Sequence, residues 1–173
     1  SSERGLQWLA ENQSHSGSFG EGYVVANTSM AGLAFLAHGH TPGRGPYGEV
    51  VTQTIRYLID QQGRSGYITE PDGASRMHGH GYATLFLAEA FGMTHDIPGG
   101  ESGKLRESIQ KAVDVIESSQ STLGGWFYTP SEGGMPNQRD EGSVTVTQIE
   151  ALRSARNAGL NVNDKVIAKA VDY

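Results

Sequence analysis

Hydrophobic residues recur at helical spacing along the chain, and in several segments they occupy only one side of the helix. Val51, Ile55, Leu58 and Ile59, for example, fall at positions i, i+4, i+7 and i+8. This spacing predicts an amphipathic helix with one face in a core and the other in water. Four segments of this kind are predicted: Glu3–Gln13, Val50–Gln61, Lys104–Ser119 and a last one from about Asp164.

Helices of a second kind lie between these segments. Thr28–His38 and Tyr82–Phe91 are apolar on nearly every side, and Val144–Asn157 is a more polar counterpart. A helix that is apolar all round is a buried helix. Each is expected to end at a glycine, because glycine is the usual residue at a helix C-terminus. The three closing glycines are Gly39, Gly92 and Gly159.

A short motif recurs after the amphipathic helices. Its glutamine stands at residues 13, 62 and 120, its glycine at residues 17, 66 and 124, and its large apolar side chain is Phe19, Ile68 or Trp126. The steps of 49 and 58 residues indicate stacked supersecondary units. The glutamine can bond to carbonyls at the helix end or in the next unit, the glycine permits a turn, and the large side chain can fill the seam between units. The sequence therefore predicts an all-α fold with one domain, residues 1–173, made of about three helical hairpins and the start of a fourth.

Composition removes several function classes. The chain has 173 residues, a net charge of −6 and no Cys. No run of Lys or Arg is present, so we expect no nucleic-acid partner. No apolar stretch approaches the ~20 residues that span a bilayer, so we expect no transmembrane segment. Neither a metal nor a cofactor is expected, because thiolate ligands are absent and His78 and His80 lack a third ligand at a defined spacing.

The segments LAENQSHSGSFG and IESSQSTLGGWFYTP resemble the repeat of squalene and oxidosqualene cyclases and of protein prenyltransferase β-subunits. The chain is most similar to bacterial proteins called "prenyltransferase and squalene oxidase repeat". This resemblance covers essentially the whole chain. It implies an arc of an α/α toroid, an incomplete ring with alternating outer and inner helices, in which the inner-helix N-termini gather at one rim of a central cavity. It also implies an exported bacterial protein whose signal peptide would lie outside this sequence.

The signatures of the family's known activities are absent from these residues. Cyclases use a DxDD motif, and the prenyltransferases hold zinc with Asp, Cys and His; this sequence has neither DxDD nor Cys. The resemblance therefore implies a repeat domain that binds a ligand in a concave cavity, with catalysis left open. One alternative is an isoprenoid cyclase or carbohydrate-active enzyme whose catalytic residues lie partly elsewhere. Another is a structural or protein-interaction module.

The segment before each inner helix changes chemistry from unit to unit, although the stacking residues recur. It reads HGHG in the second unit and RDEGS in the third. Positions that vary within a regular repeat are where a site can be built, so we expect a ligand, a hydrophobic or carbohydrate small molecule, near this rim. The candidate ligand-binding residues are His78, His80, Tyr82, Glu89, Asp140 and Glu141.

These residues also have ordinary structural interpretations. The two histidines can cap a helix, the acidic pair can favour a helix N-terminus through its charge, and Glu89 can pair with an arginine of a neighbouring helix. Both ends of the chain fall within a repeat and carry apolar pairs, Leu6 with Leu9 and Val166 with Ile167. Exposed apolar faces tend to be covered, so we expect a second copy (self-association through open repeat ends), a swapped helix or more chain over at least one end.

Overall fold

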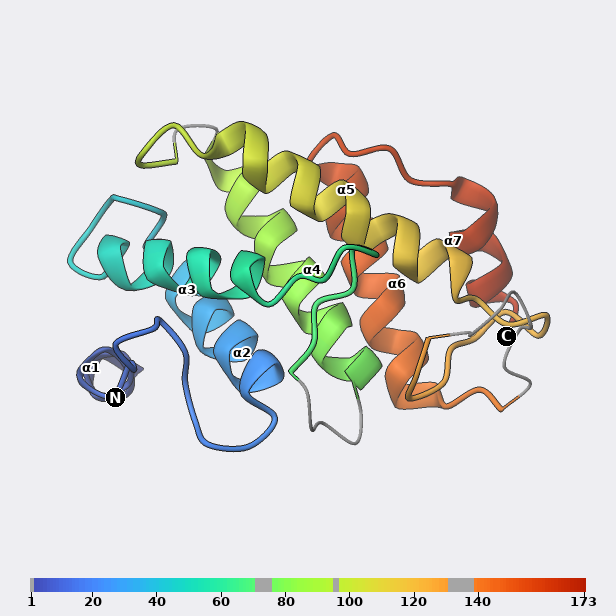
Figure 1. The fold of residues 1–173 in the computed structure, drawn as a ribbon, viewed down its shortest axis with the longest axis horizontal. Helices are drawn as coiled ribbons and strands as arrows, with labels where there is room; N and C mark the ends of the chain where they lie inside the picture. The colour runs from blue at the N-terminus through green and yellow to red at the C-terminus, as the bar shows by residue number, and fades with distance from the viewer. Residues whose placement is uncertain (1, 71–75, 95–96, 131–138) are drawn as a thin grey trace.

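The structure is a computed structural model that describes residues 2–70, 76–94, 97–130 and 139–173. These residues form seven α-helices joined by turns (Figure 1). Within the described ranges no strand forms, and the only bridges are Thr41 with Arg44 and Gln62 with Ile68. The fold is therefore all-α, as the hydrophobic pattern predicts. The helices are α1 (Ser2–Glu11), α2 (Val24–Ala37), α3 (Gly48–Asp60), α4 (Arg76–Met93), α5 (Ser102–Ser118), α6 (Gly142–Asn157) and α7 (Asp164–Val171).

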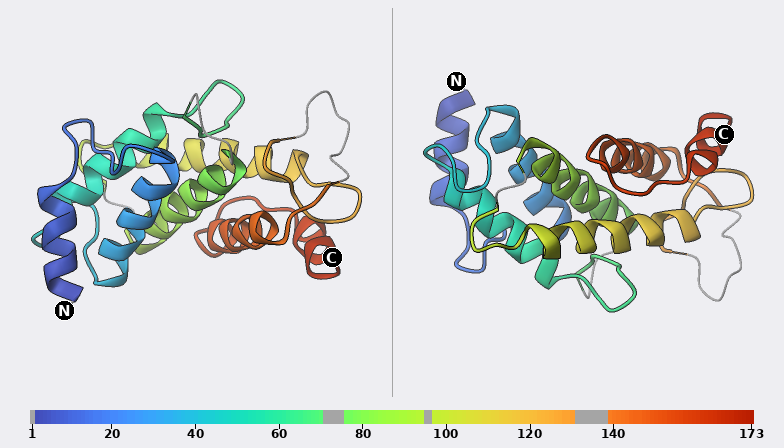
Figure 2. Two further views of the ribbon diagram at one scale, coloured as in Figure 1. Left: turned by 90° about the horizontal axis from the view of Figure 1, so that it is seen from below. Right: turned by 90° about the horizontal axis from the view of Figure 1, so that it is seen from above.

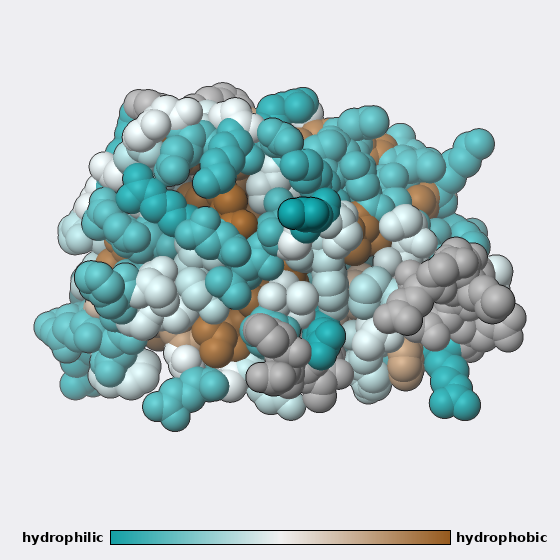
Figure 3. Space-filling model, viewed as in Figure 1, coloured by the Kyte–Doolittle hydropathy of each residue, from teal (hydrophilic) through white to brown (hydrophobic). Residues whose placement is uncertain are grey.

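The even-numbered helices α2, α4 and α6 pack side by side, while α3 and α5 lie across them (Figure 1). Helix α1 is at one end of the row and α7 at the other (Figure 2). The odd-numbered helices are amphipathic. In α3, for example, Val51, Ile55 and Leu58 are buried, while the opposite face is exposed. The face over α3 and α5 is accordingly mostly hydrophilic (Figure 3).

The even-numbered helices approach closely because glycines lie at their crossings. A Cβ on Gly32 of α2 would overlap the ring of Phe86 in α4, and a Cβ on Gly81 of α4 would overlap Thr147 and Gln148 of α6. Gln148 also donates its Nε2 hydrogen to the Met77 carbonyl at 2.8 Å. A bulkier residue at Gly32 or Gly81 would separate the helices and expose their apolar surfaces.

The recurring glutamines connect each unit to the next. Gln62 Nε2 donates to the carbonyl of Gly66 in its own turn at 2.8 Å and to Ser108 O in α5 at 2.9 Å. The other two glutamines make the same pair of bonds, Gln13 to Gly17 and Val50, and Gln120 to Gly124 and Val166. The prediction that the glutamine bonds to the neighbouring unit is confirmed.

The third position of the motif fills the seam. Phe19, Ile68 and Trp126 are buried, and their backbone amides donate to Thr28 Oγ1, His80 Nδ1 and Thr145 Oγ1, respectively, at 2.9–3.1 Å. Thr28, His80 and Thr145 therefore occupy the same place near the starts of α2, α4 and α6. This equivalence sets the register of the three even-numbered helices.

Helices cover most of the predicted segments Thr28–His38 and Tyr82–Phe91, but their two predicted starts and one predicted end are wrong. Helix α2 begins at Val24 rather than Thr28, and α4 begins at Arg76 rather than Tyr82, so HGHG lies inside the first two turns of α4. Glycine costs about 1 kcal/mol within a helix, but here it allows close packing against Val25 and Gln148. Gly92 also lies within α4 and does not close it, whereas Gly39 and Gly159 follow their helices with φ of +82°.

None of the helices in the described part of the chain is both long enough and apolar enough to cross a membrane.

Candidate functional site

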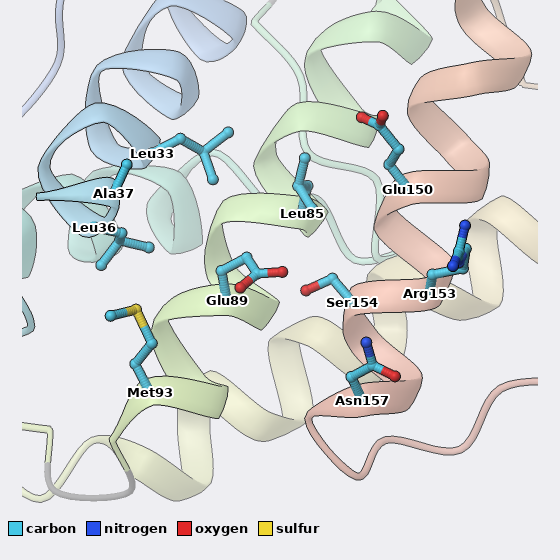
Figure 4. Close-up of a pocket in the computed structure, with 10 residues that line it drawn as sticks. All are labelled: Leu33, Leu36, Ala37, Leu85, Glu89, Met93, Glu150, Arg153, Ser154 and Asn157. Atoms are coloured by element: carbon cyan, nitrogen blue, oxygen red, sulfur yellow. The ribbon is translucent and has the colours of Figure 1, made fainter. Parts of the chain in front are cut away.

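The exposed faces of α2, α4 and α6 enclose a groove toward the C-terminal ends of these helices (Figure 4). Its volume is about 510 Å³, within the range of small-molecule sites in proteins. We call it the three-helix groove. Its lining residues are Leu33, Leu36 and Ala37 of α2, Leu85, Glu89 and Met93 of α4, and Glu150, Arg153, Ser154 and Asn157 of α6.

The groove has an apolar side and a polar side. Leucines and alanine from α2 form one wall, and α6 contributes only polar side chains to the other. In α4, Leu85, Glu89 and Met93 are four residues apart, so they share one face of the helix and form the floor. Figure 4 shows the Glu89 carboxylate directed toward α6 and the Ser154 hydroxyl directed back toward it.

The charged side chains of the groove are available to a ligand. Among the described residues, Glu89, Glu150 and Arg153 form no hydrogen bond or ion pair through their side chains. Elsewhere on the surface, Arg56 pairs with Glu101 and Arg156 with Asp164. The groove therefore combines unpaired carboxylate and guanidinium groups with an apolar wall.

A second polar cluster lies at the opposite ends of α4 and α6. His78 Nε2 is 2.9 Å from Ser143 Oγ, and the Ser143 hydroxyl donates its one hydrogen to Glu141 Oε2. Glu141 is the N-cap of α6 and accepts from the Val144 amide at 3.0 Å. The bonds from Ser143 and Val144 lower the pKa of Glu141, and burial lowers the pKa of His78 against the opposing effect of Glu141.

The predicted candidates His80 and Asp140 form hydrogen bonds within the fold, while Asp140 Oδ1 is buried without a partner among the described residues. His80 is fully buried: Nδ1 accepts from the Ile68 amide at 3.1 Å, so the hydrogen is on Nε2, which donates to Ala112 O at 3.1 Å. Burial lowers the pKa of His80 to about 4, so it is neutral near pH 7. Asp140 Oδ2 accepts from the Ser121 hydroxyl and, at 3.0 Å, from the Gly125 amide, which holds the turn before Trp126.

The six predicted residues are thus divided rather than gathered at one place. His78 and Glu141 are linked through Ser143, while His80 and Asp140 belong to the seams between units. Tyr82 is half-buried one turn after His78, and Glu89 lies farther along α4 in the three-helix groove. A ligand-binding role for these residues stays a prediction.

Most residues of the groove were not predicted from the sequence, because the predicted site lies at the N-terminal ends of the inner helices and the groove lies toward their C-terminal ends. One signal was present: Glu150, Arg153 and Asn157 occur at helical spacing in a segment whose counterparts are apolar. Polar residues on one face of an otherwise buried helix indicate a face open to water or to a ligand.

No group of three or more His, Cys, Asp or Glu side chains suited to a metal ion occurs in residues 2–70, 76–94, 97–130 and 139–173.

Neither the protein-family models nor the curated proteins include a match to this chain.

Proposed function

We propose that this chain is a repeat domain, similar to those of squalene cyclases and prenyltransferases, that binds a small apolar molecule with a polar end in the three-helix groove. The observation that carries the proposal is the division of that groove into an apolar wall from α2 and a polar wall from α6, with Glu89 between them. Small-molecule sites are mostly apolar with a few polar groups that fix orientation.

The lining favours an isoprenoid-like molecule over a sugar. Leu33, Leu36 and Leu85 offer aliphatic surface to a branched hydrocarbon chain, and no aromatic residue is among the described residues lining the groove. Sites for sugars commonly present an aromatic ring for stacking. Glu89, Glu150 and Arg153 would hold a hydroxyl or another polar end group.

The layered packing supports an α/α toroid arc as the architecture that surrounds this site. The even-numbered helices pack against one another in a row, as inner helices would, and their free faces form the groove. In this proposal the groove is part of a concave inner surface, and the amphipathic odd-numbered helices form the outer layer.

Calorimetric titration with farnesol and, separately, with maltohexaose tests the proposal. We expect farnesol to bind and maltohexaose not to bind. Ala37→Trp places a large ring in the groove from an exposed position at the end of α2 and should abolish farnesol binding. Ala168→Trp is the matched control, because Ala168 is also exposed and lies on α7 outside the groove; it should leave binding unchanged.

Binding of maltohexaose alone, or of neither molecule, would overturn the proposal. Equal farnesol affinity in the Ala37→Trp variant and the original chain would also contradict it, because the ligand would then occupy another surface.

A further inference from the structure

A second apolar hollow lies between α1 and α2. Helix α1 is at the end of the molecule opposite to α7 (Figure 2). The volume of the hollow is about 630 Å³. Trp8 is 61% exposed and Met30 is 46% exposed, although both are large apolar side chains. We call this hollow the α1–α2 slot. It is lined mainly by Trp8 and Leu9 of α1, by Asn12 just after α1, and by Met30, Ala31 and Ala34 of α2.

The repeat register shows what the corresponding positions do in the other units. Leu9 stands four residues before its glutamine, and its counterparts Leu58 and Ile116 are fully buried. Ala34 stands six residues after Thr28, and its counterparts Phe86 and Ala151 are also fully buried. The positions of Leu9 and Ala34 are therefore core positions in the second and third units, whereas Tyr57, the second-unit counterpart of Trp8, is half-buried.

In the second and third units, the preceding even-numbered helix packs against both helices of the pair. Phe86 of α4 packs over Gly32 of α2, four residues after Thr28. One unit later, Thr147 and Gln148 of α6 pack over Gly81 of α4, one residue after His80. Helix α2 thus packs against the α3–α4 pair, and α4 packs against the α5–α6 pair. Among the described residues, no helix packs against the α1–α2 pair in the same way.

We propose that the α1–α2 slot docks an α-helix of the same type as α2 and α4: apolar on most sides, with small residues three apart at the crossing. In α2 the two crossing positions are Ser29 and Gly32, and in α4 they are Gly81 and Thr84. The fixed register between successive even-numbered helices places such small residues over Ala31 and Ala34.

A second copy of this chain does not meet these requirements. The helix at its free end, α6, carries Val146 and Ile149 at the two crossing positions, where α2 and α4 each have a glycine. The α7 helix that follows would also fall on the place filled by α1, because an odd-numbered helix follows each even-numbered helix in the same register. The occupant is therefore a helix that brings no odd-numbered helix of its own to the place that α1 fills.

The proposal can be tested by fusing a copy of residues 24–49 in front of Ser1. Residue 50 corresponds to residue 1 when Gln62 is aligned with Gln13, so the added helix and its connection arrive in register. We expect a higher melting temperature and a shift of Trp8 fluorescence to shorter wavelength. Acrylamide quenching of Trp8 should fall toward the level of buried Trp126. Trp8→Phe in both proteins assigns the signal.

The matched control is the same fusion carrying Gly32→Leu in the added copy only, which should leave Trp8 as exposed as in the original chain. Ala34→Lys on the receiving face should have the same effect. Unchanged quenching and melting temperature in the unmodified fusion would overturn the proposal. Concentration-dependent protection of Trp8 in the original chain would also overturn it, because a second copy would then fill the slot.

Discussion

Gln62 and Ser108 hold each other through two hydrogen bonds across the seam between successive units. Gln62 Nε2 donates to the Ser108 carbonyl at 2.9 Å, and the Ser108 hydroxyl donates to Gln62 Oε1 at 2.8 Å. The same Nε2 closes the turn at Gly66. One side chain thus joins the end of its own helix, its own turn and the next odd-numbered helix.

Replacing Gln62 by Leu should destabilise the fold by about 2 kcal/mol, because partly buried carbonyl and hydroxyl groups lose their partner. Urea denaturation measures the change. Gln7→Leu is the control, since Gln7 is exposed and its side chain bonds to Glu11, one turn away. This substitution should change the free energy of unfolding by no more than about 0.5 kcal/mol. Equal effects of the two substitutions would show that the seam bonds do not stabilise the stack.

Gly66→Ala should cost at least about 2 kcal/mol, because the residue has a φ of +94° and its new Cβ would overlap the Lys111 carbonyl. Gly103→Ala is the matched control: Gly103 lies in α5, and a Cβ there meets no atom within 4 Å. Alanine at that position should stabilise the protein by about 0.5 kcal/mol. Opposite signs in thermal melts are expected, and a neutral Gly66→Ala would refute the tight approach.

Substitutions of Trp126 test how much a buried ring in the seam between units stabilises the fold. The Trp126 ring is buried, and Nε1 donates to the Ile116 carbonyl at 2.8 Å. Trp126→Ala should cost roughly 3–5 kcal/mol through lost burial and the resulting cavity. Trp126→Phe keeps most of the ring and should cost less, with part of the loss, about 1 kcal/mol, due to the missing hydrogen bond. Equal urea midpoints for the two variants would contradict this role.

His80 should make the stability depend on pH. The pKa of its imidazole is lowered from 6.5 to about 4 in the folded chain, mainly by burial. Between these values the unfolded chain binds a proton that the folded chain does not, so the free energy of unfolding falls as the pH is lowered from about 6.5 to about 4. The loss should reach up to about 3 kcal/mol.

His80→Thr removes this dependence while keeping an acceptor for the Ile68 amide, since threonine occupies the equivalent places at Thr28 and Thr145. Urea midpoints measured from pH 4 to pH 7 provide the test. The exposed His15 is the control, and His15→Thr should leave the pH dependence intact. An unchanged slope in His80→Thr would show that another group is responsible.

The repeat itself could be predicted from the sequence because it rests on local rules. The one-sided apolar spacing gave α3 and α5, and the common register of Gln62 with Gly66 indicated a turn that meets the next unit. The start of α4 could not be predicted in this way. Glycines at 79 and 81 suggest a loop by propensity, and only contact with Val25 and Gln148 explains why they lie in a helix.

Of the residues that line the three-helix groove, only Glu89 was predicted from the sequence as a ligand-binding residue. The walls of the groove combine side chains from three helices far apart in the chain, such as Leu33, Leu85 and Ser154. Their convergence depends on how far apart the helix axes are held, which is set by the glycine crossings. The histidines stand out in the sequence more than the groove residues do. The equivalence of His80 with Thr28 and Thr145, however, appears only from the hydrogen bonds that they accept from backbone amides.

The most direct test of ligand binding in the groove is to map farnesol onto the backbone amides by two-dimensional NMR. We expect the largest chemical-shift changes at groove residues such as Leu33, Glu89 and Ser154, and small changes at His78 and Ser143 at the other ends of the helices. Saturating shifts confined to His78 and Ser143, or no shifts at ligand saturation, would contradict the account.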